Sequence, residues 1–360
     1  MSNIKFQICA ALLAACLLCG RAWAAELPPE LERASPEAAA LLSGDTEESF
    51  GLLRGLGKIW QESLTALKDH LLSGVRSTAA IMAGVVLLGV LESAAPEGRD
   101  AVGRCAGAAG ALWITAVSAG DLSALIGLGQ KTIGDISSLG TVLVPVLAAA
   151  EAAGGGVTAA SVRQVAAVFF AGVLLRLING LLLPMVYLYI GVSAAGAVVE
   201  GDAMERIGTL LKKLTGWTLG GLLTLFITYL AVSGAVAGAV DVHALKLARS
   251  AVSAAVPVVG GILSEAAESL LAGAGILKGM VGTFGTLAVL GACLLPVLRL
   301  GCQYLLYQGA SLVAAMAGPK KLTDLLSMLA DAFGLVLAMT AASAAVLLIA
   351  IVSSLTAVSP

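Results

Sequence analysis

The sequence predicts an all-α, polytopic membrane protein of about six transmembrane helices. Three observations lead to this fold class: an apolar fraction of 59% over 360 residues, a charged fraction of only 12%, and several apolar stretches long enough to cross a bilayer. Soluble domains carry about 25% charged residues, so this chain has too little polar side-chain surface to cover a soluble fold.

Residues 1–24 have the pattern of a secretory signal peptide. Lys5 supplies the basic start, Ile8–Leu18 the short apolar run, and Ala22–Ala24 a cleavage site of small residues. The apolar run is shorter than the roughly 20 residues that a membrane span needs. An alternative is a lipoprotein signal, in which Cys16 is lipidated after cleavage. In both cases we expect the mature amino terminus outside the cytoplasm.

Residues 25–76 predict an acidic extracytoplasmic tail that is followed by an amphipathic helix. Within 25–50, Arg33 is the single basic residue among many carboxylates and three prolines, a composition typical of disorder. Residues 51–76 repeat leucines at helical spacing, with charged residues at the other positions. This helix lies on the membrane surface, packs on a partner, or packs against the protein's own bundle.

The transmembrane helices are predicted from the apolar stretches that follow. They cover about residues 77–91, 103–120, a part of 165–199, 216–240, 281–306 and 333–355. The third stretch is longer than one span needs, and Arg176 and Asn179 interrupt it ahead of Pro184. It predicts either one long broken helix or a tight hairpin, with any break buried in protein or facing a wet cavity.

Basic residues between the spans predict the orientation. They lie in three segments, at Arg99 and Arg104, at Arg206, Lys212 and Lys213, and at Lys320 and Lys321. Placing these segments in the cytoplasm satisfies the positive-inside rule and agrees with an exported amino terminus. Lys246 and Arg249 conflict with this scheme, because it puts them outside. We expect a multi-pass cell-membrane protein.

An internal duplication is predicted from two pairs of similar segments. Leu143–Val146 is similar to Ala255–Val258, and Leu182–Met185 is similar to Leu294–Val297, with both proline pairs offset by 112 residues. The first two spans, in residues 77–120, would then precede two parallel repeat units at 121–240 and 241–360. Duplicated units with broken helices are typical of transporters, whose sites lie between the repeats.

Two groups of residues are candidates for function. The Val-Pro-Val segments are expected to be broken or re-entrant, and the candidate helix-break positions are Pro145, Pro184, Pro257, Pro296, Gly260 and Gly261. The candidate polar or interface positions are Arg176, Asn179, Glu265, Glu268 and Glu151. Ionisable residues inside a membrane usually mark function, although a surface helix that carries the two close glutamates remains an alternative.

No pattern in the sequence predicts catalysis, a metal or a cofactor. The chain lacks a phosphate-binding loop, a nucleophile elbow and a zinc-protease motif. Its six cysteines and two histidines have no zinc-ligand spacing, and a net charge of −2 offers no basic stripe for nucleic acid. We therefore expect a non-enzyme, and any ATP-driven process would need a separate ATPase subunit.

The segment Ser250–Ala266 resembles the most recognisable part of the stage III sporulation protein AE family. Its core reads Val-Pro-Val-Val-Gly-Gly-x-x-Ser-Glu from Val256 to Glu265, and the Lys212-Lys213 loop and the Leu294–Pro296 span agree with the family's plan. The resemblance covers roughly residues 45–356. The family has no accepted catalytic residues, so it implies only structural or interface roles for Val256–Gly261 and Glu265.

The resemblance implies a membrane subunit of the sporulation trans-envelope channel or secretion complex, in the mother-cell membrane around the forespore. That complex supports late forespore gene expression. The implied partners are other stage III sporulation membrane proteins, a forespore-side partner and a separate ATPase. The alternative is a permease-like transporter of a small solute or ion through the duplicated bundle. It requires Arg176, Asn179, Glu265 and Glu268 to converge at mid-membrane depth.

Overall fold

The structure, a computed structural model, describes residues 51–93, 100–153, 157–198, 203–255, 260–317 and 319–356. Every element in these ranges is helical: α4 (Gly51–Ser93), α5 (Asp100–Ala153), α6 (Val157–Leu177), the π-helix η1 (Ile178–Leu182), α7 (Leu183–Val198), α8 (Ala203–Ala255), α9 (Gly260–Ala317) and α10 (Lys320–Thr356). Across the described ranges, six helical segments are long and apolar enough to cross a membrane. The all-α fold class and the six spans are therefore confirmed.

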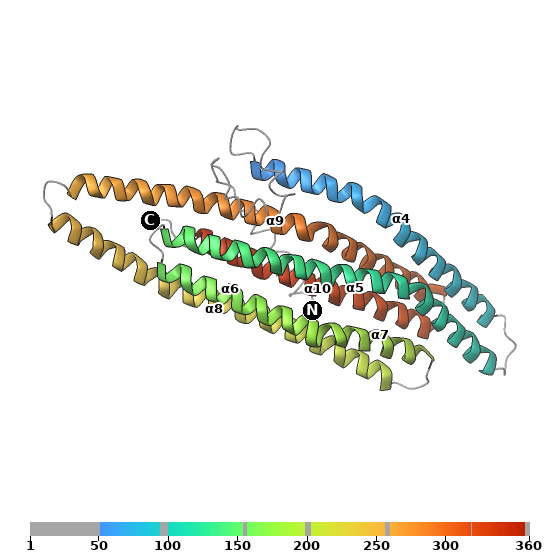
Figure 1. Ribbon diagram of the computed structural model, residues 1–360. Helices are drawn as coiled ribbons and strands as arrows, with labels where there is room; N and C mark the ends of the chain where they lie inside the picture. The colour runs from blue at the N-terminus through green and yellow to red at the C-terminus, as the bar shows by residue number, and fades with distance from the viewer. Residues whose placement is uncertain are drawn as a thin grey trace.

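The helices form one elongated bundle with α10 at its centre (Figure 1). Helix α10 packs against α9, α5, α7, α6 and α8, and every side chain from Ala341 to Leu348 is buried. Alanine and serine dominate the first half of this stretch, so neighbouring backbones can approach closely. The most apolar span thus forms the core of the bundle and is shielded from lipid by the other helices.

Helix α4 combines the predicted amphipathic helix with the first predicted span. Ile59 and Leu67 are buried, and Ile59 lies beside Gly291 as α4 packs along α9. Of the three interpretations of residues 51–76, packing against the protein's own bundle is the one observed. The predicted export signal and acidic tail, in residues 1–50, lie outside the described residues.

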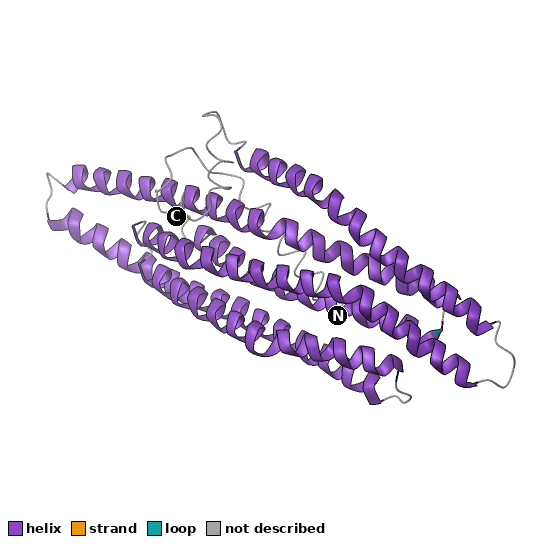
Figure 2. Ribbon diagram, turned by 45° about the vertical axis from the view of Figure 1, so that its right-hand side comes forward, coloured by secondary structure: helices purple, strands orange, loops and turns teal. Residues whose placement is uncertain are grey.

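Several helices are much longer than the predicted spans. Helix α5 has 54 residues and α9 has 58, which at about 1.5 Å per residue corresponds to roughly 80 Å or more. A bilayer core is only about 30 Å thick. The predicted second span ends before Asp121, yet α5 continues because an α-helix satisfies its backbone hydrogen bonds internally whatever its side chains carry. Figure 2 shows how far these helices extend together.

Two of the candidate helix-break positions lie inside continuous helices. Helix α5 runs through Pro145 and α9 runs through Pro296, which differs from the expected breaks. An interior proline removes one backbone hydrogen bond and usually only kinks a helix that is well packed. Val144 and Leu147, on either side of Pro145, are both buried, so packing holds α5 together there. The first Val-Pro-Val segment is therefore part of a spanning helix and is not re-entrant.

The remaining break positions lie at the junctions between helices. Pro184 is the second residue of α7 and follows η1, whose wide turn is closed by the Leu183 N–H donating to the Ile178 carbonyl. The stretch Gln164–Val198 therefore runs as one interrupted helix rather than as a hairpin. Gly260 and Gly261 are the first two residues of α9, whereas Pro257 lies outside the described residues.

The basic segments gather at one end of the bundle. The ends of α4, α7 and α9 and the starts of α5, α8 and α10 all lie at that end (Figure 1), where Arg104, Arg206 and Lys320 stand near the starts of their helices. Lys246 and Arg249 lie in the last part of α8, at the opposite end. A proline-bearing helical stretch followed by a second helix occurs twice: α6 to α7 followed by α8, and α9 followed by α10. The internal duplication stays a prediction.

Candidate functional site

A cluster of polar side chains, here called the Asp121 cluster, lies between α4, α5 and α9. Asp121 Oδ2 accepts hydrogen bonds from Ser77 Oγ at 2.8 Å and from Gln303 Nε2 at 3.0 Å. The Tyr307 hydroxyl lies 3.0 Å from Ser118 Oγ and 3.3 Å from Asp121 Oδ2. Ser118 and Tyr307 are fully buried. These five residues tie together three membrane-spanning helices.

Local packing brings the three helices close enough for these bonds. A Cβ atom on Gly74 of α4 would lie 2.7 Å from Gln303 Oε1 and 3.0 Å from Leu306 Cδ1, so the glycine lets these side chains of α9 approach α4 closely. On the other side, the Tyr307 ring packs against Phe333 of α10, with 5.0 Å between the ring centroids. The cluster is thereby anchored to the central helix.

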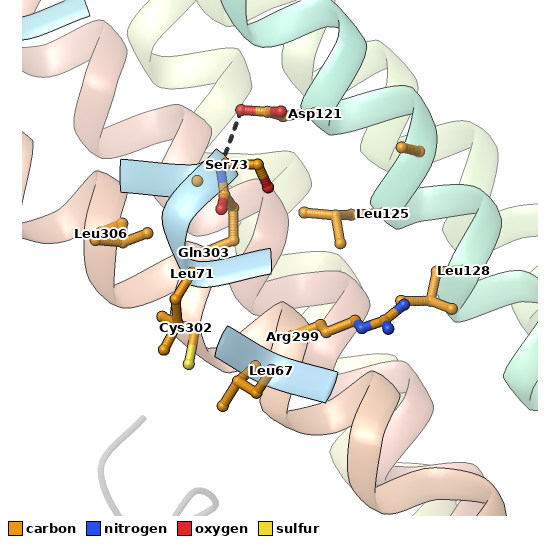
Figure 3. A pocket seen from close by; sticks show the side chains of 12 residues that line it. Leu67, Leu71, Ser73, Asp121, Leu125, Leu128, Arg299, Cys302, Gln303 and Leu306 are labelled. Carbon is orange, nitrogen blue, oxygen red and sulfur yellow. Dashed lines mark hydrogen bonds between the residues drawn. The ribbon is translucent and has the colours of Figure 1, made fainter. Parts of the chain in front are cut away.

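A cavity of about 340 Å³ opens beside the cluster (Figure 3). Asp121 of α5 and Arg299 of α9 both line it, together with Leu125 and Leu128 of α5. Arg299 Nε is buried and has no hydrogen-bond partner among the described residues. The cavity has room for several water molecules and holds one anionic and one cationic side chain, so it is a polar space inside an otherwise apolar bundle.

An ion pair lies at nearly the same level of the bundle as the Asp121 cluster. Lys212 Nζ of α8 forms an ion pair with Asp331 Oδ2 of α10, and the side chains are 26% and 22% exposed. Asp331 is two residues before Phe333, which contacts the Asp121 cluster through Tyr307. We call the cluster and this ion pair the polar layer. Helices α4, α5, α8, α9 and α10 all contribute to it.

The structure separates the predicted polar positions. Arg176, near the end of α6, and Asn179, in η1, are exposed, and Asn179 Oδ1 accepts a 3.5 Å hydrogen bond from Gln130 Nε2 of α5. Glu151 is 1% exposed near the end of α5, where it borders a small pocket together with Ser354 of α10. Glu151 therefore lies apart from Arg176 and Asn179, further along the same bundle.

Glu265 and Glu268 lie in the first turns of α9, and their side chains are outside the described structure. Gly285 of α9 faces Leu143 of α5, and 20 residues separate Glu265 from Gly285. At about 1.5 Å per residue, Glu265 lies about 30 Å beyond the level of Leu143, and the Gln130–Asn179 contact lies about 20 Å on the other side of it. These positions do not converge.

Asp121 and Asp331, the acidic residues of the polar layer, were not singled out from the sequence. Each is a single acidic residue flanked by apolar neighbours within a helical stretch, and that pattern could have identified both. In the described parts of the chain, no three His, Cys, Asp or Glu side chains lie close enough to hold a metal ion. The polar layer can exchange hydrogen bonds and hold water, and it offers no arrangement typical of a nucleophile and its base.

Comparison with known proteins places this bundle in a family. The family described as stage III sporulation protein AE matches residues 53–357, a range that includes all six candidate membrane spans. The stage III sporulation protein AE of Bacillus subtilis (strain 168) is 23% identical over 193 residues, which cover 54% of this chain and 48% of that relative. The match thus spans about half the length of the curated relative. No solved structure matches the chain. The chain therefore belongs to the stage III sporulation protein AE family, and its role is in sporulation.

Proposed function

We propose that this protein is a membrane subunit of a trans-envelope channel or secretion complex in the mother-cell membrane around the forespore. In this complex it supports late forespore gene expression. The observation that carries the proposal is the family match across residues 53–357, which includes every candidate membrane span. Its partners are other stage III sporulation membrane proteins, a forespore-side protein and a separate ATPase.

The polar layer supports a role that involves water inside the membrane. A purely passive scaffold would be packed dry, because a charged side chain at bilayer depth is costly unless it is paired or hydrated. Here Asp121 and Arg299 both face one cavity, and Arg299 Nε has no protein partner in the described structure. A subunit that works next to an aqueous path accounts for these groups better than a dry scaffold does.

The orientation that we propose follows the basic segments. Their end of the bundle faces the mother-cell cytoplasm, and the mature amino terminus faces the space between the two membranes. Labelling single cysteines in intact cells tests this orientation: Lys320→Cys should be labelled only from the cytoplasm, and Glu265→Cys only from outside. The reverse pattern would overturn the proposed orientation.

A permease-like transporter that works alone is less well supported. It would need Arg176, Asn179, Glu265 and Glu268 at one depth, whereas roughly 50 Å along the bundle axis separate Asn179 from Glu265. The polar groups that do lie together, in the polar layer, come from other positions. The channel-complex subunit is therefore the function that the arrangement supports best.

Deletion of the gene in its spore-forming host tests the proposed function. We expect the deletion strain to grow normally in rich medium and to engulf its forespores, and then to arrest without forming heat-resistant spores. A plasmid-borne copy of the full chain should restore the titre of heat-resistant spores. A normal spore titre in the deletion strain would contradict the proposal.

A further inference from the structure

The outer face of α5 carries polar and small residues along much of its length. Between residues 114 and 153, none of its large hydrophobic side chains is exposed. The exposed polar residues on this face, here called the α5 strip, are Ser123, Gln130, Lys131, Asp135, Ser138 and Thr141. From Lys131 to Thr141 they recur every three or four residues, and Ser123 precedes Gln130 by two helical turns, which places them on one side of the helix. In Figure 1, α5 runs between α4 and the path from α6 to α7.

The charged residues of the α5 strip have no partner of their own. Lys131 and Asp135 form no ion pair among the described residues, in contrast to Lys212 and Asp331. No atom lies over the helix surface at Gly127, where an added Cβ atom would meet nothing within 4 Å. The hydrogen bond from Gln130 to Asn179 marks the edge of the strip, where η1 meets α5.

Two contacts between helices allow the depth of the α5 strip to be compared with that of α8. The Gln130–Asn179 hydrogen bond sets the level of η1 against α5. The Phe170 ring lies 5.2 Å from that of Phe226, which sets α6 against α8. Asn179 is nine residues after Phe170, and nine residues before Phe226 is Trp217, so Trp217 lies level with Gln130.

The α8 side of the bundle exposes mostly apolar side chains and no charged one between residues 217 and 228. Trp217 is 78% exposed and Leu225, level with Ser138, is 59% exposed. Such side chains are typical of a surface that faces lipid. A bilayer has the same composition all around the molecule at a given depth, so the α5 strip with Lys131 and Asp135 does not suit acyl chains at that depth.

We infer that the α5 strip faces water in the assembled complex and forms one wall of an aqueous passage for polar solutes. One strip makes only one wall, so the remaining walls come from other chains of the assembly. In this respect the inference rests on the proposed function. Lys131 and Asp135 are hydrated in the passage, which accounts for the absence of protein partners, and small residues such as Gly127 leave the passage wide.

The test uses single cysteines in the full chain, with the six native cysteines replaced by alanine. Ser138→Cys samples the α5 strip, Leu225→Cys samples the apolar side at the same level, and Ala345→Cys samples the core of α10. Membranes from sporulating cells are treated with a membrane-impermeant, positively charged methanethiosulfonate reagent, which reacts with thiolates in water. We expect Ser138→Cys to react at least about ten-fold faster than Leu225→Cys, and Ala345→Cys to remain unmodified.

Equal, slow rates at positions 138 and 225 would overturn the inference. So would a Ser138→Cys variant that reacts slowly in membranes and fast only after detergent has dissociated the assembly, because that result means a dry contact with a partner chain. The spore titre of the deletion strain is read separately. If Ser138→Cys reacts fast but the deletion strain sporulates normally, only the proposed function is refuted. If Ser138→Cys reacts slowly and the deletion strain arrests, only the aqueous passage is refuted.

Discussion

Replacing Asp121 with alanine should weaken the bundle from within. The substitution removes the acceptor that Ser77 of α4 and Gln303 of α9 share, at 2.8 and 3.0 Å. Both donors then lie in a partly buried site where the cavity alone can supply a replacement. The hydrogen bonds from Ser77 and Gln303 to α5 are both lost, while the bond between Tyr307 and Ser118 remains.

The expected magnitude follows from what such bonds contribute in membranes. Interhelical hydrogen bonds average about 0.6 kcal/mol and reach about 1.7 kcal/mol, less than a bond to a charged group contributes in general. Two bonds to Asp121 therefore predict a loss of about 1–3 kcal/mol in the free energy of unfolding. Asp121→Asn keeps one oxygen acceptor and should lose about 1 kcal/mol or less.

The assay is reversible unfolding of the purified full chain in mixed micelles, by titration with a denaturing detergent. The matched control is Asp135→Ala, since Asp135 is an acidic residue of the same helix that is exposed and has no ion-pair partner in the described structure. It should change stability by less than about 0.5 kcal/mol. A double-mutant cycle of Asp121→Ala with Gln303→Leu should give a coupling energy of about 0.5–1.7 kcal/mol. Equal stability of the Asp121→Ala and Asp135→Ala variants would refute the assignment of the cluster as a structural tie.

Two further variant pairs test the packing in the same unfolding assay. Lys212→Ala breaks the ion pair with Asp331 and should cost about 1–2 kcal/mol, between the values for exposed and for buried pairs, whereas its exposed neighbour in Lys213→Ala should cost little. Gly129→Ala places a Cβ atom 2.6 Å from a valine methyl of α10, while Gly127→Ala meets nothing within 4 Å. Gly129→Ala should therefore be at least about 1 kcal/mol less stable than Gly127→Ala, which gains helix propensity. Equal stabilities within either pair would show that the contact contributes nothing.

The helices were predictable because hydropathy reports directly on membrane spans. The interruption near Asn179 was also predictable, and the structure forms it as the π-helix η1 ahead of Pro184. Helix lengths were not predictable in the same way, since Asp121 and Pro145 look like ends in the sequence but are accommodated by side-chain partners and by packing.

A local pattern could have pointed to Asp121 and Asp331, but not to the contacts that they make in the polar layer. Asp121 meets Gln303, 182 residues away, and Lys212 meets Asp331, 119 residues away. Such contacts depend on how six helices pack, which no spacing within one helix reports. Arg176 was predicted as a polar position because it is a charged residue within an apolar stretch, and the structure places it on an exposed surface.

The most direct test of the central claim is whether the chain works as a subunit of a larger complex. An epitope-tagged full chain is purified in a mild detergent from cells that have just completed engulfment, and its mass and its partners are measured by size-exclusion chromatography and mass spectrometry. We expect other stage III sporulation membrane proteins to co-purify with it in one high-mass peak, and an unrelated tagged membrane protein to recover none of them. Elution of the chain alone, with no sporulation membrane protein enriched over that control, would contradict the account.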